Sequence, residues 1–377
     1  MTRATDRPHK VVDLFSGAGG LSLGAARAGF TVCCAVEIDR QAAATHRRNF
    51  PQTVHLEEDI SQLTGKRLES VLDIKNGDLA GIIGGPPCQG FSCIGKNEAS
   101  DPRNRLFADF FRIVAEARPR FFLAENVPGL LHAGNVKIRE EALSYVDNEY
   151  ILLPPMTICA RDFGAPTTRR RVFFLGYRKD EVQRLCPQDF LPPAGVEIVT
   201  VRDALKGLPV KIDPGWQTED QGWRIARVHG GGFYAKRLHG SIPPGVGDSY
   251  ALKRLKKESR ASGCLGTIHS EVVARRYSKI EPGKRDPVSK SHRLSLDKFC
   301  PTLRAGTASD YGRFQAVRPL HPTETRVITP REAARLQGFP DWFRFSSAKW
   351  HSFREIGSSV SPILAERILA VLRNAIA

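Results

Sequence analysis

The chain has 377 residues, which allows one large domain or a large domain with a smaller one. Hydrophobic residues make up 41% and charged residues 25%, as in ordinary globular proteins, and no run of about 18 apolar residues predicts a membrane span. Residues 1–10 are polar and basic with no apolar segment behind them, which does not fit a secretory signal. We therefore expect no membrane attachment and a cytoplasmic location.

The charge balance is strongly basic. The formal net charge is +16, from 56 Lys and Arg against 40 Asp and Glu, and residues 250–298 alone hold 13 Lys and Arg against 5 Asp and Glu. Such an excess favours a polyanionic partner, since each neutralised phosphate releases counterions. Charge alone leaves open a solvated basic surface that only serves solubility.

Eight cysteines are spread over the whole chain, and none forms a CxxC pair. This spacing argues against a zinc cluster and against a disulfide framework, so we expect no metal site. Most of the cysteines are expected to be buried as small hydrophobic side chains. Cys88 is the exception, because of the residues around it.

Short apolar runs alternate with helix-like stretches over the first 180 residues. Buried strands are predicted over 10–15, 31–37, 79–84, 120–125, 150–159 and 171–176, and helices over 21–29, 40–50 and 103–118. This alternation predicts an α/β fold with a mostly parallel sheet and helices on both faces. Ligands of such sheets bind beyond the carboxyl ends of the strands, which is where the unusual residues fall.

The composition divides the chain into three segments. We interpret 1–184 as the domain that carries the sheet and 185–300 as a smaller, irregular domain, because Gly, Pro and basic residues become frequent after Asp180. Regular pattern returns in 301–377, where Pro330 opens a predicted helix over 331–337 and apolar spacing predicts a last helix over 362–377. This third segment is expected to pack back on the first.

A glycine-rich turn, Asp13-Leu-Phe-Ser-Gly-Ala-Gly-Gly20, lies between the first predicted strand and a helix. Glycines there let the backbone approach a ligand closely, although a tight turn without a ligand has the same pattern. The second strand ends near Glu37, where an acid can bind ribose hydroxyls, and the third leads to Asp59 and Ile60. Together these positions favour a bound adenosyl cofactor.

A second group of residues suggests nucleophilic chemistry. Gly84-Gly-Pro-Pro-Cys-Gln-Gly-Phe-Ser92 holds Cys88 at the end of a strand, and the neighbouring strand ends at Glu125, which can protonate a ring nitrogen as a thiolate adds to the ring. Strand alternation places Arg169 and Arg171 on one face, where guanidinium groups can hold a carbonyl, a phosphate or the charge of the thiolate. The open alternatives are a rigid turn with an incidental cysteine, a loop-capping acid and a solvated basic strand edge.

Five motifs follow one another in a fixed order: Phe15-Ser-Gly-Ala-Gly-Gly20, Pro87-Cys-Gln89, Glu125-Asn-Val127, Arg169-x-Arg171 and Thr329-Pro-Arg-Glu-Ala-Ala-Arg-Leu-Gln-Gly-Phe-Pro340. In this order they resemble the motifs of the DNA (cytosine-5) methyltransferases, over essentially the whole chain except about 185–295. The resemblance implies a Rossmann-like, S-adenosylmethionine-dependent methyltransferase sheet with a smaller target-recognition domain. It also implies double-stranded DNA as the partner, monomeric action, and a place in a restriction-modification system or as an orphan modification enzyme.

The resemblance implies a role for each motif residue. Cys88 would add to C6 of a flipped-out cytosine, Glu125 would protonate or hydrogen-bond N3, and C5 would then take the methyl group. Arg169 and Arg171 would orient the base and assist the thiolate, and residues 89–104 resemble a mobile loop that closes over the flipped base. The implied cofactor-binding residues are Phe15, Ser16, Gly17, Gly20, Glu37, Ile38, Asp59, Ile60, Pro87, Leu106, Ser359 and Val360.

Two positions depart from the family pattern. Thr167 stands where glutamine is usual, and Ser358 replaces the usual asparagine in Gly357-Ser-Ser-Val360. The shorter Ser358 can be tolerated, can weaken cofactor affinity or can admit a modified sulfonium donor. We expect ordinary methyl transfer.

The basic region 185–295 has the position of the family's target-recognition region. Its candidate DNA contacts, mostly to phosphates, are Arg237, Arg254, Arg275, Arg276 and Arg293. Phe233, Tyr234 and Tyr250 are equally compatible with a small core or with stacking on bases.

Three other functions compete with this interpretation. The first is an RNA cytosine-5 methyltransferase of the same fold, for which a shorter recognition region would be expected. The second is a non-catalytic DNA-binding regulator, which would have lost Cys88, Glu125 or an arginine. The third, an NAD-linked enzyme, gives no reason for the pairing of Cys88 with Glu125.

Overall fold

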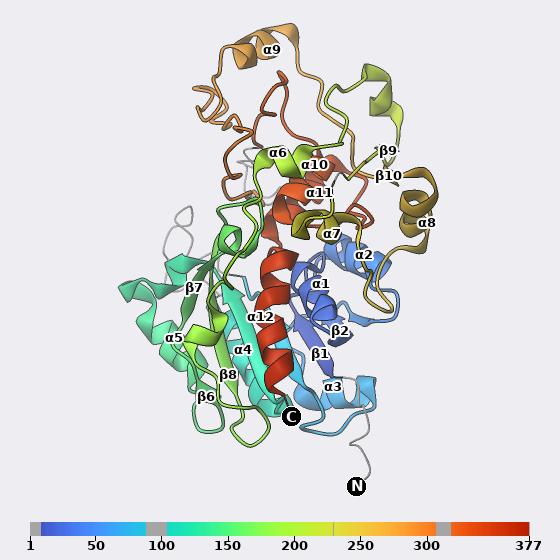
Figure 1. The fold of residues 1–377 in the computed structure, drawn as a ribbon. Coiled ribbons are helices and arrows are strands. Elements are labelled where there is room, and N and C mark those ends of the chain that lie inside the picture. Colours follow the sequence, from blue (N-terminus) through green and yellow to red (C-terminus); the bar gives the residue numbers. More distant parts are fainter. Residues whose placement is uncertain (1–8, 88–103, 229, 307–317, 377) are drawn as a thin grey trace.

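The structure, a computed structural model, describes residues 9–87, 104–228, 230–306 and 318–376. The lower half in Figure 1 is built on one eight-stranded sheet with the spatial order β3-β2-β1-β4-β5-β8-β6, and β7 pairs with β8. The strands are β1 (Lys10–Leu14), β2 (Thr31–Val36), β3 (Val54–Leu56), β4 (Gly81–Gly84), β5 (Phe121–Asn126), β6 (Ile151–Leu152), β7 (Met156–Cys159) and β8 (Arg170–Tyr177).

The central strands run parallel, so their carboxyl ends meet at one edge. β1 pairs in parallel with β2 and β4, β2 with β3, and β4 with β5, whereas β8 is antiparallel to β5 and to its other neighbours β6 and β7. The register of β4 on β5 places Gly84 opposite Ala124, next to Glu125. The turn that leads to Cys88 and the end of β5 are therefore side by side.

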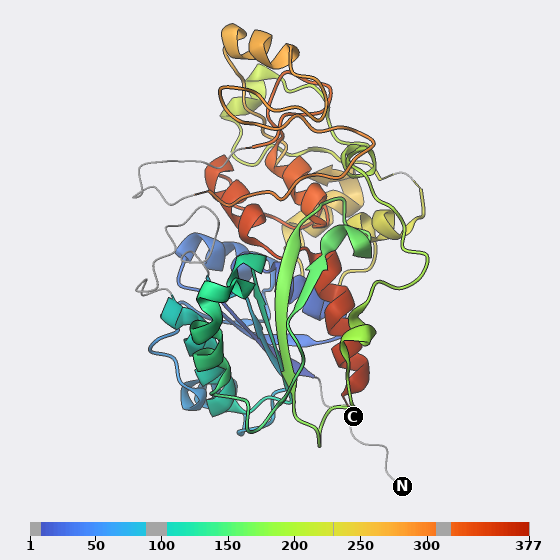
Figure 2. The same cartoon turned by 90° about the vertical axis from the view of Figure 1, so that its left-hand side faces the viewer.

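Helices cover both faces of this sheet, as strand alternation requires. Val11, Ile83 and Leu123 belong to the core shared with α1 and α12, whereas Val12 and Ile82 belong to the core under α3 and α4. Figure 2 shows the sheet between α4 and α5 on one side and α12 on the other. The helices of this half are α1 (Gly20–Arg27), α2 (Arg40–Asn49), α3 (Gly65–Leu72), α4 (Asn104–Ala117), α5 (Val136–Leu143) and α12 (Pro362–Ala375).

The upper half combines short helices with a two-stranded ribbon, and α9 forms its far end (Figure 1). Its elements are α6 (Val201–Leu205), β9 (Arg224–Ile225), α7 (Phe233–His239), α8 (Ser249–Glu258), β10 (Arg260–Ala261), α9 (Glu271–Ser278), α10 (Pro330–Gln337) and α11 (Lys349–Ser358). Leu205, Tyr234 and Leu238 of this half join the same buried cluster as α1 and α12. Single 3-10 turns lie at Pro128–Leu131, Ala133–Asn135, Ala160–Phe163, Pro187–Phe190 and Pro214–Thr218.

The predicted α/β fold is confirmed, with two local differences. The run 150–159 was predicted as one strand but forms β6 and β7, since Pro154 and Pro155 between them have no N–H for a sheet hydrogen bond. The region 185–300 holds more helix than its weak hydrophobic periodicity predicts. Its helices span only 5–10 residues, and such short helices leave little periodic pattern in the sequence. No helix in the described ranges is long and apolar enough to cross a bilayer.

Candidate functional site

The glycine-rich turn after β1 brings backbone close to the C-terminal segment. Phe15, Gly17 and Gly19 all have positive φ, at 59°, 54° and 100°. A side chain at Gly20 would place its Cβ 2.4 Å from the carbonyl oxygen of Val360, so only glycine permits this approach. The turn and residues 358–360 thus form two adjoining walls, although they lie at opposite ends of the chain.

Glu37 closes the turn from the end of β2. Its two carboxylate oxygens each accept a hydrogen bond of 2.8 Å, one from the backbone N–H of Gly17 and one from that of Asp39. Burial raises the pKa of Glu37, while these two bonds favour its ionised form. The carboxylate is thereby fixed at the end of β2.

These elements enclose a cavity of about 460 Å³ beyond the carboxyl ends of β1, β2 and β4. All twelve residues predicted to bind a cofactor line it: Phe15, Ser16, Gly17, Gly20, Glu37, Ile38, Asp59, Ile60, Pro87, Leu106, Ser359 and Val360. Ile38 leaves 64% of its surface exposed beside it, which is a high value for an apolar side chain. The structure thus joins residues from six separate stretches of sequence in one site.

Several acids that were not predicted from the sequence also line this cavity. Asp13, Asp39, Glu58 and Glu355 join Glu37, Asp59 and Glu125 there, and the lining includes only one arginine or lysine in the described ranges, Arg354. Arg354 is paired with Asp39 at 2.6 Å. A protein of net charge +16 therefore has an acidic cavity.

Two of the added acids are unusual in their ionisation. Burial raises the pKa of Asp13 to about 7 and that of Glu355 also to about 7. Signals for both were present in the sequence, since Asp13 opens the glycine-rich turn and Glu355 precedes Gly357-Ser-Ser-Val360 by two residues.

The end of β5 carries Glu125, and the end of β4 leads along the sequence toward the predicted nucleophile. Cys88 and the loop 89–103 lie outside the described residues, which stop at Pro87 on this side. A Cβ on Gly85 would lie 3.1 Å from Oε2 of Glu125, and the side-chain amide of Asn126 donates to the carbonyl of Pro86 at 3.2 Å. The segment that leads to Cys88 is therefore held directly against the end of β5.

The two predicted arginines at the start of β8, Arg169 just before it and Arg171 within it, have different partners. Arg171 Nε lies 2.5 Å from Oε1 of Glu125, and both side chains are mostly buried. Arg169 is buried, and its guanidinium donates to the backbone carbonyls of Leu303 (3.0 Å) and Ser358 (3.1 Å). Arg171 thus accompanies the acid, whereas Arg169 ties β8 to the C-terminal wall of the cavity.

The two departures from the family pattern occupy different surroundings. Thr167 is fully buried and bridges to Cys300. Ser358 lines the cavity, and its hydroxyl donates back to the carbonyl of Glu355 at 3.1 Å.

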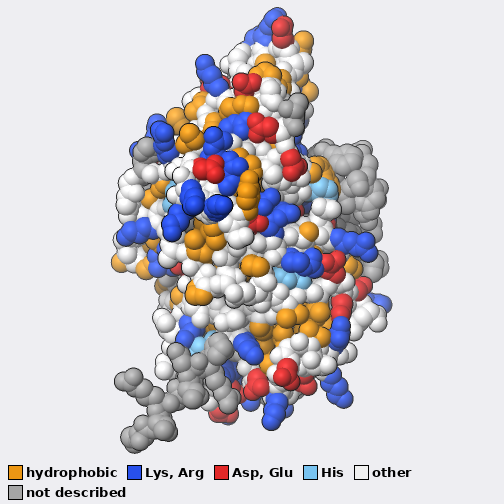
Figure 3. All heavy atoms as spheres, turned by 90° about the vertical axis from the view of Figure 1, so that its right-hand side faces the viewer, with side chains coloured by type: hydrophobic (Ala, Val, Ile, Leu, Met, Phe, Trp, Pro, Cys, Tyr) orange, Lys and Arg blue, Asp and Glu red, His pale blue; other side chains and the backbone are white. Residues whose placement is uncertain are grey.

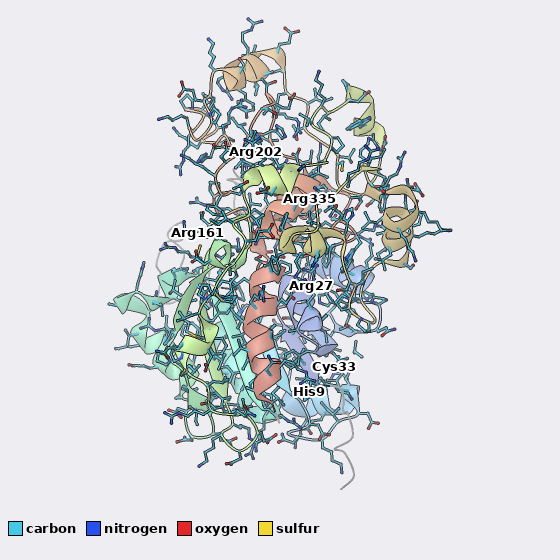
Figure 4. All side chains as sticks on the ribbon, viewed as in Figure 1. His9, Arg27, Cys33, Arg161, Arg202 and Arg335 are labelled. Atoms are coloured by element: carbon cyan, nitrogen blue, oxygen red, sulfur yellow. The ribbon has the colours of Figure 1, made fainter. Side chains whose placement is uncertain are left out.

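The arginines predicted to contact DNA fall into two groups. Arg293 is buried and donates to the carbonyls of Tyr277 and His321, and Arg237 pairs with Glu366 of α12 at 2.5 Å while its own carbonyl accepts from Arg27. Figure 4 shows Arg27 at this junction below α7. Both arginines hold the fold together, so the prediction that they contact DNA is not supported by their positions.

The other three arginines have freer positions. Arg275 is exposed, Arg276 pairs with Asp286 at 3.0 Å, and Arg254 lies over the ring of Trp223. Of the three aromatic residues, Tyr234 is buried, Phe233 packs against the main core, and Tyr250 is 50% exposed.

Two further observations concern possible metal ligands and the cysteine thiols. The described residues contain no group of three or more His, Cys, Asp or Glu side chains that could hold a metal ion. The six cysteines among them are free, and burial raises the pKa of the Cys33 and Cys264 thiols to about 12.

Comparison with known proteins shows similarity along almost the whole chain. Residues 9–374 match the profile of the C-5 cytosine-specific DNA methylases. The type II methyltransferase M.XorII of Xanthomonas oryzae is 39% identical over 95% of this chain and 82% of its own, and M.DdeI of Desulfomicrobium norvegicum is 32% identical over 95% and 87%.

The chain is also similar to solved structures of methyltransferases. A protein described as a DNA modification methyltransferase encoded within an Escherichia coli prophage superposes with a TM-score of 0.87 at 48% identity, over 97% of this chain and 99% of its own. The Dnmt2 methyltransferase of S. pombe superposes with a TM-score of 0.59 at 18% identity, over 96% and 97%, which is a likeness of fold alone.

Proposed function

Because the chain belongs to the C-5 cytosine-specific DNA methylase family and is a DNA (cytosine-5) methyltransferase, we propose that it transfers the methyl group of S-adenosylmethionine to C5 of a flipped-out cytosine in a specific duplex sequence. Carried over from its type II relatives, a role in a restriction-modification system is proposed with it, and an orphan modification enzyme is the alternative.

The observation that carries this proposal is the acidic cavity that ends at Glu125. S-adenosylmethionine has a sulfonium and an ammonium group, and seven carboxyl side chains line the cavity. Glu37 at the end of β2 has the position from which an acid binds ribose hydroxyls, and Ile38 offers an apolar surface to the adenine ring. The residues present therefore fit an adenosyl cofactor with a positive charge.

When bound, the cofactor supplies an electrophilic methyl group. The thiolate of Cys88 adds to C6 of cytosine, and Glu125 donates a proton or hydrogen bond to N3, which leaves C5 nucleophilic. After C5 is methylated, loss of its proton and of the sulfur–C6 bond releases the product. Arg171 holds the Glu125 carboxylate in place, and we propose that Arg169 acts through the backbone of Ser358 rather than by touching the base.

The base must leave the duplex for this chemistry, because the ring face is covered by stacking in B-DNA. The upper half is the proposed target-recognition domain, with the boundaries 185–300 predicted from the sequence. Figure 3, which faces the side of α8, shows Lys and Arg side chains gathered over this half. We propose duplex DNA as the partner, monomeric action, and the cytoplasm as the location.

The test is base-resolution bisulfite sequencing of DNA from cells that express the wild type or Cys88→Ala. Protected cytosines in one short context, absent with the variant, are the expected result. DNA that stays unmodified despite folded wild-type protein would contradict the proposal, and methylation of transfer RNA instead would favour the RNA enzyme. Binding of S-adenosylmethionine to purified protein, measured by calorimetry, tests the cofactor separately.

A further inference from the structure

Four polar side chains form a continuous chain from the cavity to its outer side. The hydroxyl of Ser22 on α1 donates to Oδ2 of Asp13 on β1 at 2.5 Å, and Nε2 of His46 on α2 lies 3.0 Å from the Ser22 hydroxyl. Nδ1 of His46 lies 2.9 Å from Nε2 of His55 on β3. Asp13 lines the cavity, whereas His55 is only half-buried.

The surrounding structure is shaped around this chain. Asp13, Ser22 and His46 are at most 1% exposed, and the ring of Phe50 stacks on His46 with 4.3 Å between centroids. A Cβ on Gly19 would lie 2.5 Å from the Phe50 ring and 3.0 Å from the His46 ring. Gly19 of the glycine-rich turn therefore makes room for the histidine.

The hydrogen bonds that link these four side chains can point in either of two directions, depending on whether Asp13 carries a proton. When Asp13 is ionised, Ser22 donates to it, so the Ser22 oxygen accepts from His46 Nε2–H and His46 Nδ1 accepts from His55 Nε2–H. When Asp13 carries a proton and donates to Ser22, every bond reverses, and His46 becomes the Nδ1–H tautomer. Burial holds the pKa of His46 well below its usual range, so the ring has one proton in either state.

His55, at the outer end of these hydrogen bonds, can hold or lose the one proton by which the two states differ. Burial lowers the pKa of His55 to about 4, so its ring is neutral near pH 7, although a backbone hydrogen bond with Thr53 opposes this shift. Nε2 already faces His46, which leaves Nδ1 for the bond with Thr53. In the reversed state His55 Nδ1–H donates there. Loss of that proton, with one proton shifted along each bond toward His55, converts neutral Asp13 into the carboxylate. One proton leaves the protein in this step.

We propose that Ser22, His46 and His55 are positioning residues, which form a proton relay that fixes Asp13 in the cavity and carries its proton out when a cationic cofactor binds. Asp13 is suited to this role, since its Oδ1 is buried without a hydrogen-bond partner among the described residues. The charged neighbours are Glu37 beside Asp13, Arg47 beside both histidines, and Glu57 beside His55. The link to a sulfonium cofactor rests on the proposed function.

The relay has a pH-dependent consequence. Burial raises the pKa of Asp13 to about 7, so at pH 6 most molecules must lose the Asp13 proton before the carboxylate can face a cation. A bound cation favours the ionised form. Affinity for S-adenosylmethionine is therefore expected to rise about tenfold between pH 6 and pH 8, as one proton is no longer displaced.

The experiment is NMR of protein labelled with ¹⁵N-histidine, titrated from pH 5.5 to 8.5 with and without S-adenosylmethionine. The ring nitrogens of His46 are expected to change from the Nδ1–H to the Nε2–H pattern with a midpoint near pH 7, and the cofactor should shift the midpoint downward. Calorimetry over the same range measures the affinity. Ser22→Ala should uncouple His46 from the titration and flatten the affinity profile between pH 6 and 8.

Ser144→Ala is the matched control, since that hydroxyl donates to the Glu141 carbonyl on the exposed end of α5. A single His46 tautomer over the whole range in wild-type protein would overturn the relay, and so would an unchanged affinity profile in folded Ser22→Ala protein. If the tautomer changes with pH but S-adenosylmethionine does not bind, the relay stands and the proposed cofactor is wrong. The wild-type titration decides even if Ser22→Ala does not fold.

Discussion

Buried charges occur in two regions of this molecule, and they are compensated in opposite ways. Around α10, Arg335 pairs with Asp341 at 2.7 Å and Arg326 with Glu332 at 2.8 Å, each inside the upper half. Figure 4 places Arg335 where α6, α7 and α10 meet. In the cavity, Asp13 is equally buried but has a serine hydroxyl as its partner, and no described arginine or lysine pairs with it.

The pKa values of two fully buried aspartates show what this difference means. Burial alone would raise the pKa of Asp341, yet Arg335 holds it well below the usual range, while burial raises the pKa of Asp13 to about 7. A buried charge that the chain itself neutralises belongs to the fold. A buried acid without a counter-charge, on the wall of a cavity, is better explained by a cation that comes from outside.

Glu125 shares a property with each of the two regions: it lines the cavity, and like the acids around α10 it has an arginine partner. We expect Glu125→Gln to lower the methylation rate by about 10²–10⁴-fold, since the amide cannot donate the same proton to N3. Affinity for S-adenosylmethionine should change much less than the rate, because Arg171 already compensates the charge of the Glu125 carboxylate. Single-turnover kinetics with labelled methyl groups and calorimetry measure the two effects, and an unchanged rate would remove Glu125 from the reaction.

The buried ion pairs around α10, Arg335 with Asp341 and Arg326 with Glu332, are expected to affect the free energy of unfolding and not the chemistry. Arg335→Met removes the arginine partner of the buried Asp341 and leaves it with His239, whose Nε2 lies 2.6 Å from Oδ2 of Asp341. The loss of this charge pair should lower the free energy of unfolding by about 3–5 kcal/mol, measured by urea unfolding. Replacement of both partners by apolar residues should recover much of this loss.

An exposed pair supplies the control for that cluster. Arg202→Ala removes the pair with Asp297, whose side chains are 55% and 78% exposed, and should cost less than about 1 kcal/mol. Equal losses for Arg202→Ala and Arg335→Met would contradict the distinction between the two regions.

The sequence predicted the lower half well because its signals are local. Strand runs, the turn Asp13–Gly20 and the order of motifs identify the sheet and the cavity without any knowledge of packing. Adjacent strand ends follow from parallel topology, and the register of β4 on β5 places Gly84 opposite Ala124, next to Glu125. The nearness of Cys88 to Glu125 stays a prediction.

The partners of individual side chains could not be predicted in this way. Arg169 and Arg293 look like ligands of an anion in the sequence, but both donate to backbone carbonyls of distant segments. The unusual ionisation of Asp13 and Glu355 could not be predicted either, since it comes from burial in the folded protein, and the Glu355 carboxylate accepts from Thr45, 310 residues away. Sequence patterns give residue types at strand ends, whereas compensation of charge is decided by tertiary contacts.

The last expected effect concerns the pH dependence of stability at the cavity. The folded pKa of Asp13, about 7, lies above its unfolded value of 3.8. Between these values the unfolded chain ionises and the folded chain does not, so this carboxyl increasingly destabilises the protein as pH rises, and the penalty is complete above about pH 7. The Asp13→Asn variant has no carboxyl at this position and so lacks this pH-dependent loss of stability, and its side-chain amide oxygen can still accept a hydrogen bond from the Ser22 hydroxyl.

We therefore expect Asp13→Asn to be more stable than wild type by about 1–3 kcal/mol at pH 8, with the difference vanishing toward pH 4. Urea unfolding at several pH values measures it. The same variant should bind S-adenosylmethionine more weakly, because the carboxylate that faces the cation is gone. A variant that loses stability at pH 8 would show that Asp13 is compensated within the fold, as Asp341 is, and the contrast between the two regions would fail at that residue.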